Sequence, residues 1–243
     1  GFVERKVATF TKTARDFGLR RSKGVLLLGA PGTGKSLCAK ATATALKLPL
    51  LRADIGALYG SFVGDSERNT REMIKMAEAM SPVVLWIDEI DKTMGSATAA
   101  GLTSDVTQRV IGTILTWRQE STAPVFVVAT ANRLDKLDPA LMRPGRFDAV
   151  FWVDLPGKEE RADIFKIHLR KKQREKLPWV TAKALATLAE KSDGYSGAEI
   201  AEAVEEGLLE AFHRGTADRE LAMRDVMLAL TRSKPLSVTA EKE

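Results

Sequence analysis

The sequence predicts an α/β domain with a parallel five-stranded sheet between helices, followed by a small all-helical domain. Short apolar runs alternate with helical stretches up to residue 155, which favours parallel strands joined by crossover helices. Beyond residue 157 only helical periodicity remains, with breaks at residues 177–179, 192–197 and 213–218. The 243 residues, 44% apolar and 28% charged, are enough for a sizeable core. We therefore expect domains at residues 1–155 and 156–243.

The first part of the chain supplies two of the expected strands. Residues up to Phe17 are polar and amphipathic and predict a leading helix. The apolar run 24–30 (GVLLLGA) ends in glycine-rich sequence and predicts a buried parallel strand. A helix is expected from Lys35 to about residue 47, followed by a strand at residues 48–55 (LPLLRADI).

The later elements continue this alternation. Asp65 or Ser66 can cap a helix that runs to about residue 80, and residues 82–89 (PVVLWIDE) predict the third strand. The small, polar residues 93–101 predict a loop. The last elements expected before residue 156 are a helix at residues 103–117 and strands at residues 125–130 (VFVVAT) and 149–155 (AVFWVDL).

Composition limits the cellular setting. We expect no membrane span and no signal peptide, because no apolar run is long enough for either. A single cysteine, Cys38, excludes an intramolecular disulfide and favours a reducing compartment, the cytoplasm or one like the plastid stroma. Cys38 is either a reactive thiol or a small buried hydrophobe on a helix, and we favour the second. Because the chain begins with Gly1, we expect a fragment that lacks an N-terminal domain or an adaptor site.

The charge balance is mildly basic. Lysine and arginine number 37 against 32 acids, a formal charge of +5 that could favour nucleic acid or an acidic partner. The densest basic run, residues 168–176 (HLRKKQREK), has no aromatic residues between its charges. We interpret it as a solvated helix end, so that nucleic acid is the less favoured partner.

A phosphate-binding motif follows the first strand. Residues 29–36 (GAPGTGKS) fit the P-loop pattern G-x-x-x-x-G-K-[ST] between a predicted strand and a predicted helix. Glycines let backbone N–H groups curl round phosphates, Lys35 reaches the β- and γ-phosphates, and the Ser36 hydroxyl binds Mg²⁺. The residues expected at the nucleotide are Gly29, Pro31, Gly32, Thr33, Gly34, Lys35, Ser36 and Leu37. The motif predicts a nucleoside triphosphate site with Mg²⁺.

The third strand supplies acids to the same site. In VVLWIDE, Asp88 is expected beside the metal, and Glu89 is left to polarise the attacking water, because carboxyl ends of parallel strands face the ligand. Residues 132–135 (NRLD) loosely mimic the guanine motif N-K-x-D, but Arg133 replaces the lysine, and the metal strand ends in DEID without the switch glycine of D-x-x-G. We therefore expect ATP rather than GTP.

Six motifs in order carry a family resemblance: GAPGTGKS, SFVGDSE, LWIDEID, VVATAN, LDPALMRPGRFD and GYSGAEI. From about residue 18 to about residue 230 the chain resembles the AAA clade of the AAA+ ATPases. Within that clade it is similar to poorly characterised AAA proteins encoded in chloroplast and cyanobacterial genomes. The resemblance implies a P-loop NTPase (AAA+) sheet followed by a helical lid, and ATP hydrolysis within a homo-oligomeric ring, expected to be a hexamer.

The resemblance also implies roles for matching residues. Asn132 matches the sensor-1 residue, which contacts the γ-phosphate or the attacking water. Arg143 and Arg146 match arginine fingers, which act on the ATP of the neighbouring subunit. Two guanidinium groups in an RPGR turn are suited to clamping phosphate.

In the lid, the resemblance implies that GYSGAEI lies near the adenine base. Gly197 and Ala198 match that segment, and Ala198 occupies the position of a sensor-2 arginine, for which this clade carries alanine. His168 matches a position that often lies near the nucleotide. A lone histidine is equally well explained as a packed side chain.

Residues 58–67 (LYGSFVGDSE) place an aromatic and a β-branched side chain between glycines. Taken alone, Phe62 is best explained as packing beneath its own loop. The resemblance implies instead that Phe62, Val63 and Gly64 line the central pore and grip an extended polypeptide. We therefore hypothesise an ATP-driven, ring-forming remodeller or unfoldase of proteins. The alternatives are a nucleic-acid or nucleoprotein motor and a nucleotide-dependent assembly switch that translocates nothing.

Overall fold

The computed structural model describes residues 2–54, 65–91, 102–135, 137–143, 145–214, 219–235 and 237. The chain forms two compact units. One unit consists of Gly1–Gly29 and Lys35–Val153, and the other of Ala30–Gly34 and Asp154–Glu243. The tip of the phosphate loop thus groups with the second unit. The domain boundary expected between residues 155 and 156 stays a prediction.

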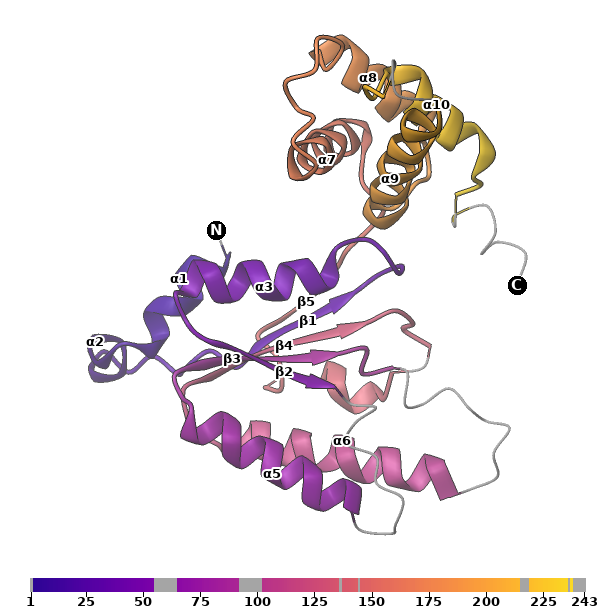
Figure 1. Cartoon of the computed structure of the whole chain (residues 1–243). Coiled ribbons are helices and arrows are strands. Elements are labelled where there is room, and N and C mark those ends of the chain that lie inside the picture. Colours follow the sequence, from indigo (N-terminus) through magenta and orange to yellow (C-terminus); the bar gives the residue numbers. More distant parts are fainter. Residues whose placement is uncertain are drawn as a thin grey trace. The chain divides into compact units, whose positions relative to one another are not determined.

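The first unit contains one five-stranded sheet with strand order β2-β3-β4-β1-β5 (Figure 1). Every pairing is parallel, so the predicted sheet is confirmed. The strands are β1 (Gly24–Leu28), β2 (Leu50–Asp54), β3 (Val83–Asp88), β4 (Val125–Ala131) and β5 (Ala149–Trp152). β1, β3 and β4 are apolar almost throughout because helices cover both faces of the sheet.

The two faces are covered by different helices, as Figure 1 shows. α3 (Lys35–Leu46) lies on one face, and α5 (Asp65–Ala79) and α6 (Leu102–Glu120) lie on the other. Alternate residues of each strand serve each face: Val25 packs on the α3 side, whereas Leu26 packs on the α5–α6 side. This sandwich fixes the carboxyl ends of the strands at one edge of the unit.

Two expectations for local structure were wrong. The single leading helix is divided into α1 (Phe2–Val7), the 3-10 turn η1 (Ala8–Phe10) and α2 (Lys12–Asp16). The Thr11 side chain accepts the N–H of Ala14 at 3.2 Å and so starts a new helix. Cys38 is exposed rather than buried, because the stripe of α3 that faces the sheet runs through Ala39, Ala43 and Leu46.

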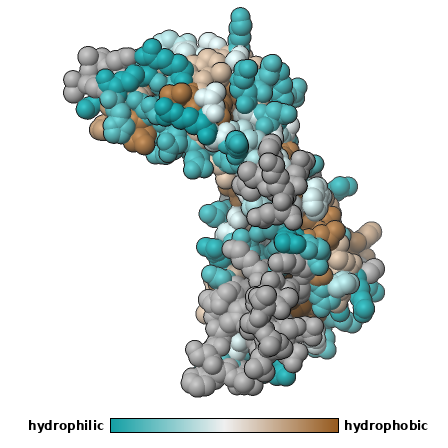
Figure 2. Space-filling model, turned by 90° about the vertical axis from the view of Figure 1, so that its right-hand side faces the viewer, coloured by the Kyte–Doolittle hydropathy of each residue, from teal (hydrophilic) through white to brown (hydrophobic). Residues whose placement is uncertain are grey.

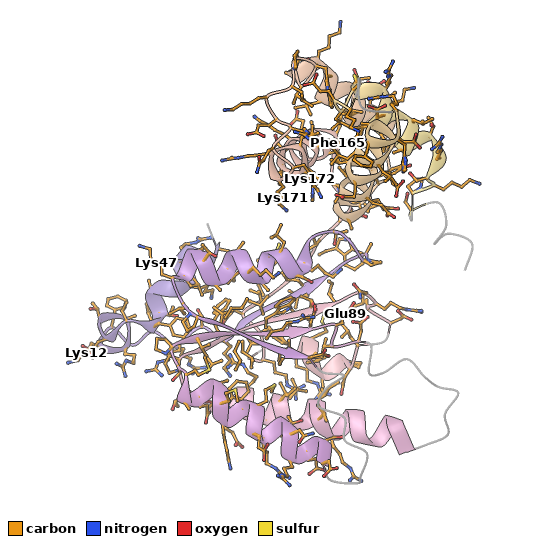
Figure 3. All side chains as sticks on the ribbon, in the orientation of Figure 1. Lys12, Lys47, Glu89, Phe165, Lys171 and Lys172 are labelled. Carbon is orange, nitrogen blue, oxygen red and sulfur yellow. The ribbon has the colours of Figure 1, made fainter. Side chains whose placement is uncertain are left out.

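The second unit contains only helices in its described part after Asp154, as predicted. They are α7 (Lys158–Lys171), α8 (Ala182–Lys191), α9 (Gly197–His213) and α10 (Met223–Arg232). Phe165 is fully buried in their common core (Figure 3). Lys171 and Lys172 are exposed at the end of α7, as the interpretation of this basic run requires.

The surface of the protein carries both hydrophilic and apolar residues. Among the residues coloured in Figure 2, hydrophilic ones predominate, with separate apolar patches. Exposed apolar side chains on the edge strand β5 are Val150, Phe151 and Trp152, the last with a relative exposure of 61%. Within the described ranges, no helix combines the length and apolar character needed to cross a bilayer.

A buried cation joins α6 to the sheet. Arg118 is 3% exposed, and its guanidinium donates to the carbonyl of Lys23, before β1, and to that of Val125, in β4. Burial lowers the pKa of Arg118 to about 10, so the group stays charged at neutral pH.

Arg118→Ala is expected to lower the free energy of unfolding by about 3 kcal/mol, because the substitution removes a buried side chain and its hydrogen bonds to the carbonyls of Lys23 and Val125. Urea denaturation of the first unit measures this change. Arg15→Ala removes an exposed arginine of α2 and is the control, expected to stay within about 0.5 kcal/mol of the parent. Equal stability of the Arg118 and Arg15 variants would contradict this role.

Candidate active site

The phosphate loop connects β1 to α3 at the carboxyl edge of the sheet. Gly29, Gly32 and Gly34 have φ angles of +153°, +77° and +94°, values that favour glycine. The Thr33 hydroxyl donates to the carbonyl of Ala30 at 2.8 Å inside the loop. The N-terminus of α3 follows directly and suits an anion. Pro31 and Leu37 are exposed, on the loop and on the first turn of α3.

Lys35 is directed into its own loop. It is 6% exposed, and Nζ donates to the carbonyl of Gly29 at 2.7 Å. Burial lowers the pKa of Lys35, and the neighbouring carboxylates of Asp91, Glu89 and Asp88 act in the opposite direction. The ammonium group of Lys35 thus lies between the carbonyl of Gly29 and the acidic side chains that follow β3. A bound polyphosphate would neutralise its charge there.

Asp88 ends β3 and gathers groups from three other elements. The Ser36 hydroxyl of α3 lies 3.5 Å from Oδ1 of Asp88, and Thr130 Oγ1 of β4 donates to the same oxygen at 2.7 Å. Arg52 of β2 donates to Oδ2 at 3.2 Å while its guanidinium lies 4.8 Å from the centre of the Trp86 ring. The hydroxyl of Ser36 and the carboxylate of Asp88 are hard oxygen ligands and fit Mg²⁺.

The described residues contain no group of three or more histidine, cysteine or acidic side chains that could hold a metal. Mg²⁺ at a nucleotide site is commonly held by only one or two protein side chains, with waters and substrate phosphates as its other ligands. Ser36 and Asp88 are therefore the donors from this chain that would hold it.

Glu89 follows the end of β3 and lies at the carboxyl edge of the sheet (Figure 3). Its φ of +50° is unusual for a residue with a side chain. The amide of Asn132, just beyond β4, donates through Nδ2 to Oε1 of Glu89 at 3.3 Å. The structure thus brings together Glu89, expected to polarise the attacking water, and Asn132, expected to contact the γ-phosphate or that water.

The turn that carries the two arginines follows the 3-10 helix η3 (Pro139–Met142), which the sequence analysis did not predict. Asp138 starts η3 by accepting the N–H of Ala140 at 2.7 Å. Arg143 follows η3 and is exposed. Arg146 is half-buried, and its guanidinium donates to the carbonyl of Ala140. Arg143 is therefore the more exposed of the two arginines.

In the second unit, α9 begins at the tip of the phosphate loop. Ser196 caps α9, and the N–H of Ala198 donates to the carbonyl of Gly32 at 3.2 Å. A Cβ on Gly32 would lie 2.7 Å from the Ser196 hydroxyl, so this approach requires glycine. A Cβ added to Gly197 would lie 3.4 Å from the same carbonyl oxygen. The structure thus brings Gly197 and Ala198 to the loop tip.

His168 lies on α7 and is half-buried. Burial lowers the pKa of its imidazole, and Lys171 and Lys172 lower it further. Among the described residues no hydrogen bond joins its side chain to the loop tip. Its expected place near a nucleotide stays a prediction. Phe62, Val63 and Gly64 lie outside the described residues, as does the loop at residues 93–101.

Sequence reasoning missed Arg52, Thr130 and Asp91. Arg52 and Thr130 are polar residues within apolar strands, a signal that the sequence carried. Asp91 is 3% exposed, and its Oδ2 accepts the N–H of Arg133 at 3.0 Å. It is the third acid of the motif DEID, and it holds the segment that follows Asn132.

Comparison with known proteins agrees with this geometry. Residues 25–155 match the model of the ATPase family associated with various cellular activities (AAA), and residues 184–228 match the AAA+ lid domain. An uncharacterized AAA domain-containing protein, ycf46, of Guillardia theta is 45% identical over 98% of this chain and 46% of its own length.

Two archaeal proteins are also similar. The cell division cycle protein 48 homolog of Archaeoglobus fulgidus is 40% identical over 79% of this chain and 26% of its own length. The proteasome-activating nucleotidase of Aeropyrum pernix is 37% identical over 90% of this chain and 53% of its own length. The chain spans about half the length of the ycf46 protein. With its sheet, its phosphate loop and its helical second unit, the chain belongs to the AAA family of ATPases.

Proposed function

We propose that this ATPase forms a ring that uses Mg²⁺ and ATP to remodel or unfold polypeptide substrates. The observation that carries the hydrolytic part is the approach of the Ser36 hydroxyl to Oδ1 of Asp88 at 3.5 Å. Lys35 lies close enough to Asp88 and Glu89 for both carboxylates to raise its pKa. The name of the relative from Aeropyrum pernix supports a polypeptide substrate, since that nucleotidase activates a proteasome, which is a protease.

We assign hydrolysis to a set of residues on this chain. Lys35 holds the β- and γ-phosphates, and Ser36 and Asp88 hold Mg²⁺, which neutralises charge on phosphate oxygens when bound. Glu89 accepts a proton from the attacking water, and the neighbouring Asn132 orients that water or contacts the γ-phosphate. The distance of 3.3 Å from Asn132 Nδ2 to Glu89 Oε1 supports this pairing.

The exposed Arg143 supports a shared active site. In this proposal Arg143 contacts the γ-phosphate bound to the neighbouring subunit, and Arg146 braces the same turn through Ala140. The apolar edge strand β5, with Trp152 61% exposed, supplies surface for contact between subunits. We propose a homo-hexamer, since rings with closed symmetry satisfy every such contact.

The pore loop at Phe62, Val63 and Gly64 is proposed to grip the substrate. An aromatic tip between glycines can contact the side chains of an extended polypeptide with little sequence preference. We further propose that residues 1–155 and 156–243 act as nucleotide-binding domain and lid, with Gly197, Ala198 and His168 near the base. We propose that an adaptor or a further domain recognises the substrate. We also propose that the protein works in a reducing compartment such as the plastid stroma or the cytoplasm.

Unfolded polypeptide is expected to stimulate ATP hydrolysis several-fold in the parent chain, and Phe62→Ala is expected to lose that stimulation. The reason is that a gripping residue couples substrate to the catalytic cycle. The measurement is the ATPase rate with and without a permanently unfolded casein. Phe17→Ala removes a phenylalanine that is 82% exposed on the same unit and is the matched control, expected to keep the stimulation.

Two other outcomes would contradict remodelling of polypeptide. Stimulation by DNA that falls steeply with salt, without any effect of casein, favours a nucleic-acid motor. A slow ATPase that ignores both polymers, in a chain whose assembly follows the bound nucleotide, favours an assembly switch.

A further inference from the structure

Thr130 lies between the two acids of the site. It belongs to β4, which pairs in parallel with β3, and it lies one residue beyond the pair Ile87–Ala129. Its side chain is 1% exposed, in a strand that is otherwise apolar. A hydroxyl buried at the end of such a strand must satisfy its hydrogen bonds within the protein.

The hydroxyl of Thr130 contacts both acidic residues. Oγ1 donates to Oδ1 of Asp88 at 2.7 Å and accepts the backbone N–H of Glu89 at 2.9 Å. A hydroxyl has one donor and two acceptor positions, so both bonds form at the same time. The short donor bond directs one oxygen of Asp88, and the acceptor bond places the backbone of Glu89.

The backbone around Glu89 needs such support. A φ of +50° is unfavourable for glutamate, and surrounding contacts must hold it. Besides the hydroxyl of Thr130, the carbonyl of the same residue accepts the N–H of Ile90 at 2.9 Å. Thr130 therefore accepts the N–H groups of the two peptide bonds that flank Glu89, directly after the end of β3.

We infer that Thr130 is a positioning residue whose hydroxyl orients the metal-binding Asp88 and the base Glu89 together. Because the Thr130 hydroxyl bonds both residues, the orientation of the Asp88 carboxylate and the backbone position of Glu89 depend on each other. The inference rests on the roles proposed for Asp88 and Glu89 and does not depend on the remodelling of polypeptide.

Thr130→Val keeps the shape and removes the hydroxyl. We expect the Mg²⁺ concentration that half-maximally strengthens ADP binding to rise about 10-fold, and kcat for ATP to fall about 10–100-fold, as for other partners of metal ligands. ADP binding without Mg²⁺ is expected to change less than about 2-fold. Calorimetric titration with ADP at a series of Mg²⁺ concentrations measures the first effect without any turnover.

Two further variants separate orientation from packing. Thr130→Ser restores the hydroxyl and is expected to recover the Mg²⁺ dependence of the parent. Thr70→Val removes an equally buried hydroxyl, which donates to the carbonyl of Ser66 within α5 at 2.7 Å, and it is expected to leave the Mg²⁺ dependence unchanged. If Thr130→Ser behaves like Thr130→Val, packing of the threonine methyl explains the effect and the inference is overturned.

A double-mutant cycle with Asp88→Asn tests whether the Thr130 hydroxyl acts through the Asp88 carboxylate. In the Asp88→Asn background Thr130→Val is expected to change the Mg²⁺ dependence less than about 2-fold, because the two groups act as one unit. If Asp88→Asn shifts the Mg²⁺ dependence but Thr130→Val alone does not, only the present inference fails. If Asp88→Asn itself has no effect, the proposed metal role fails.

Discussion

Glu89→Gln is expected to lower kcat for ATP hydrolysis by about 10²–10⁴-fold, the usual contribution of a general base. Glutamine keeps the shape and can still pair with Asn132, but it cannot accept a proton from water. ATP affinity is expected to stay close to that of the parent, because Lys35 and Ser36 bind phosphate and metal independently of Glu89. Single-turnover hydrolysis and equilibrium binding of ATP measure the two effects separately.

Glu72→Gln is the matched control for Glu89→Gln. Glu72 is exposed on α5, where its carboxylate pairs with Arg68 of the same helix at 3.1 Å, and surface pairs of this kind contribute little. The control is expected to hydrolyse ATP at the parental rate. Full hydrolysis by Glu89→Gln would remove Glu89 from the proposed chemistry.

Arg143→Ala is expected to lower the hydrolysis rate of the assembled protein by about 10³–10⁵-fold, judging by arginines supplied in trans to GTPases. The guanidinium stabilises charge that develops on the transferred phosphoryl group, and alanine cannot replace it. Because Arg143 acts on the neighbouring subunit, its loss should lower the ATPase rate only in assembled chains. After dilution to monomers, the parent and Arg143→Ala should hydrolyse ATP at the same rate. Steady-state ATPase measured across protein concentration tests this dependence.

Arg146 is expected to behave differently from Arg143. Its guanidinium donates to the carbonyl of Ala140 in its own subunit, so its loss should also loosen the turn that carries Arg143. Arg15→Ala, an exposed arginine on α2, serves as the charge-matched control. A loss in Arg143→Ala that is equally large in dilute monomers would show that Arg143 acts within its own chain.

Local signals in the sequence were sufficient for the strands and for much of the site. Continuous apolar runs predicted β1, β3 and β4, because only buried parallel strands need to be apolar on both faces. The glycines of the phosphate loop predicted its backbone conformation, since Gly32 and Gly34 have positive φ angles. Ser36 and Asp88, 52 residues apart, could be placed together because strands with helical crossovers end at one edge.

The remaining site residues depend on strand order, which local patterns do not give. Arg52 meets Asp88 because β2 pairs with β3, and Thr130 meets it because β4 pairs with β3 on the other side. Either residue alone is only a polar interruption of an apolar strand. The prediction that Cys38 is buried was wrong for a related reason. The amino-acid composition of α3 does not show which face of the helix packs on the sheet, and Cys38 lies on the other face.

The claim that active sites are shared between subunits has one direct test. Equal amounts of Glu89→Gln and Arg143→Ala are co-assembled, and the ATPase rate of the mixture is compared with each variant alone. Random neighbours in a ring pair an intact Glu89 with an intact Arg143 at about one interface in four, so the mixture should recover about a quarter of the parental rate. A mixture as inactive as its components would contradict a shared site.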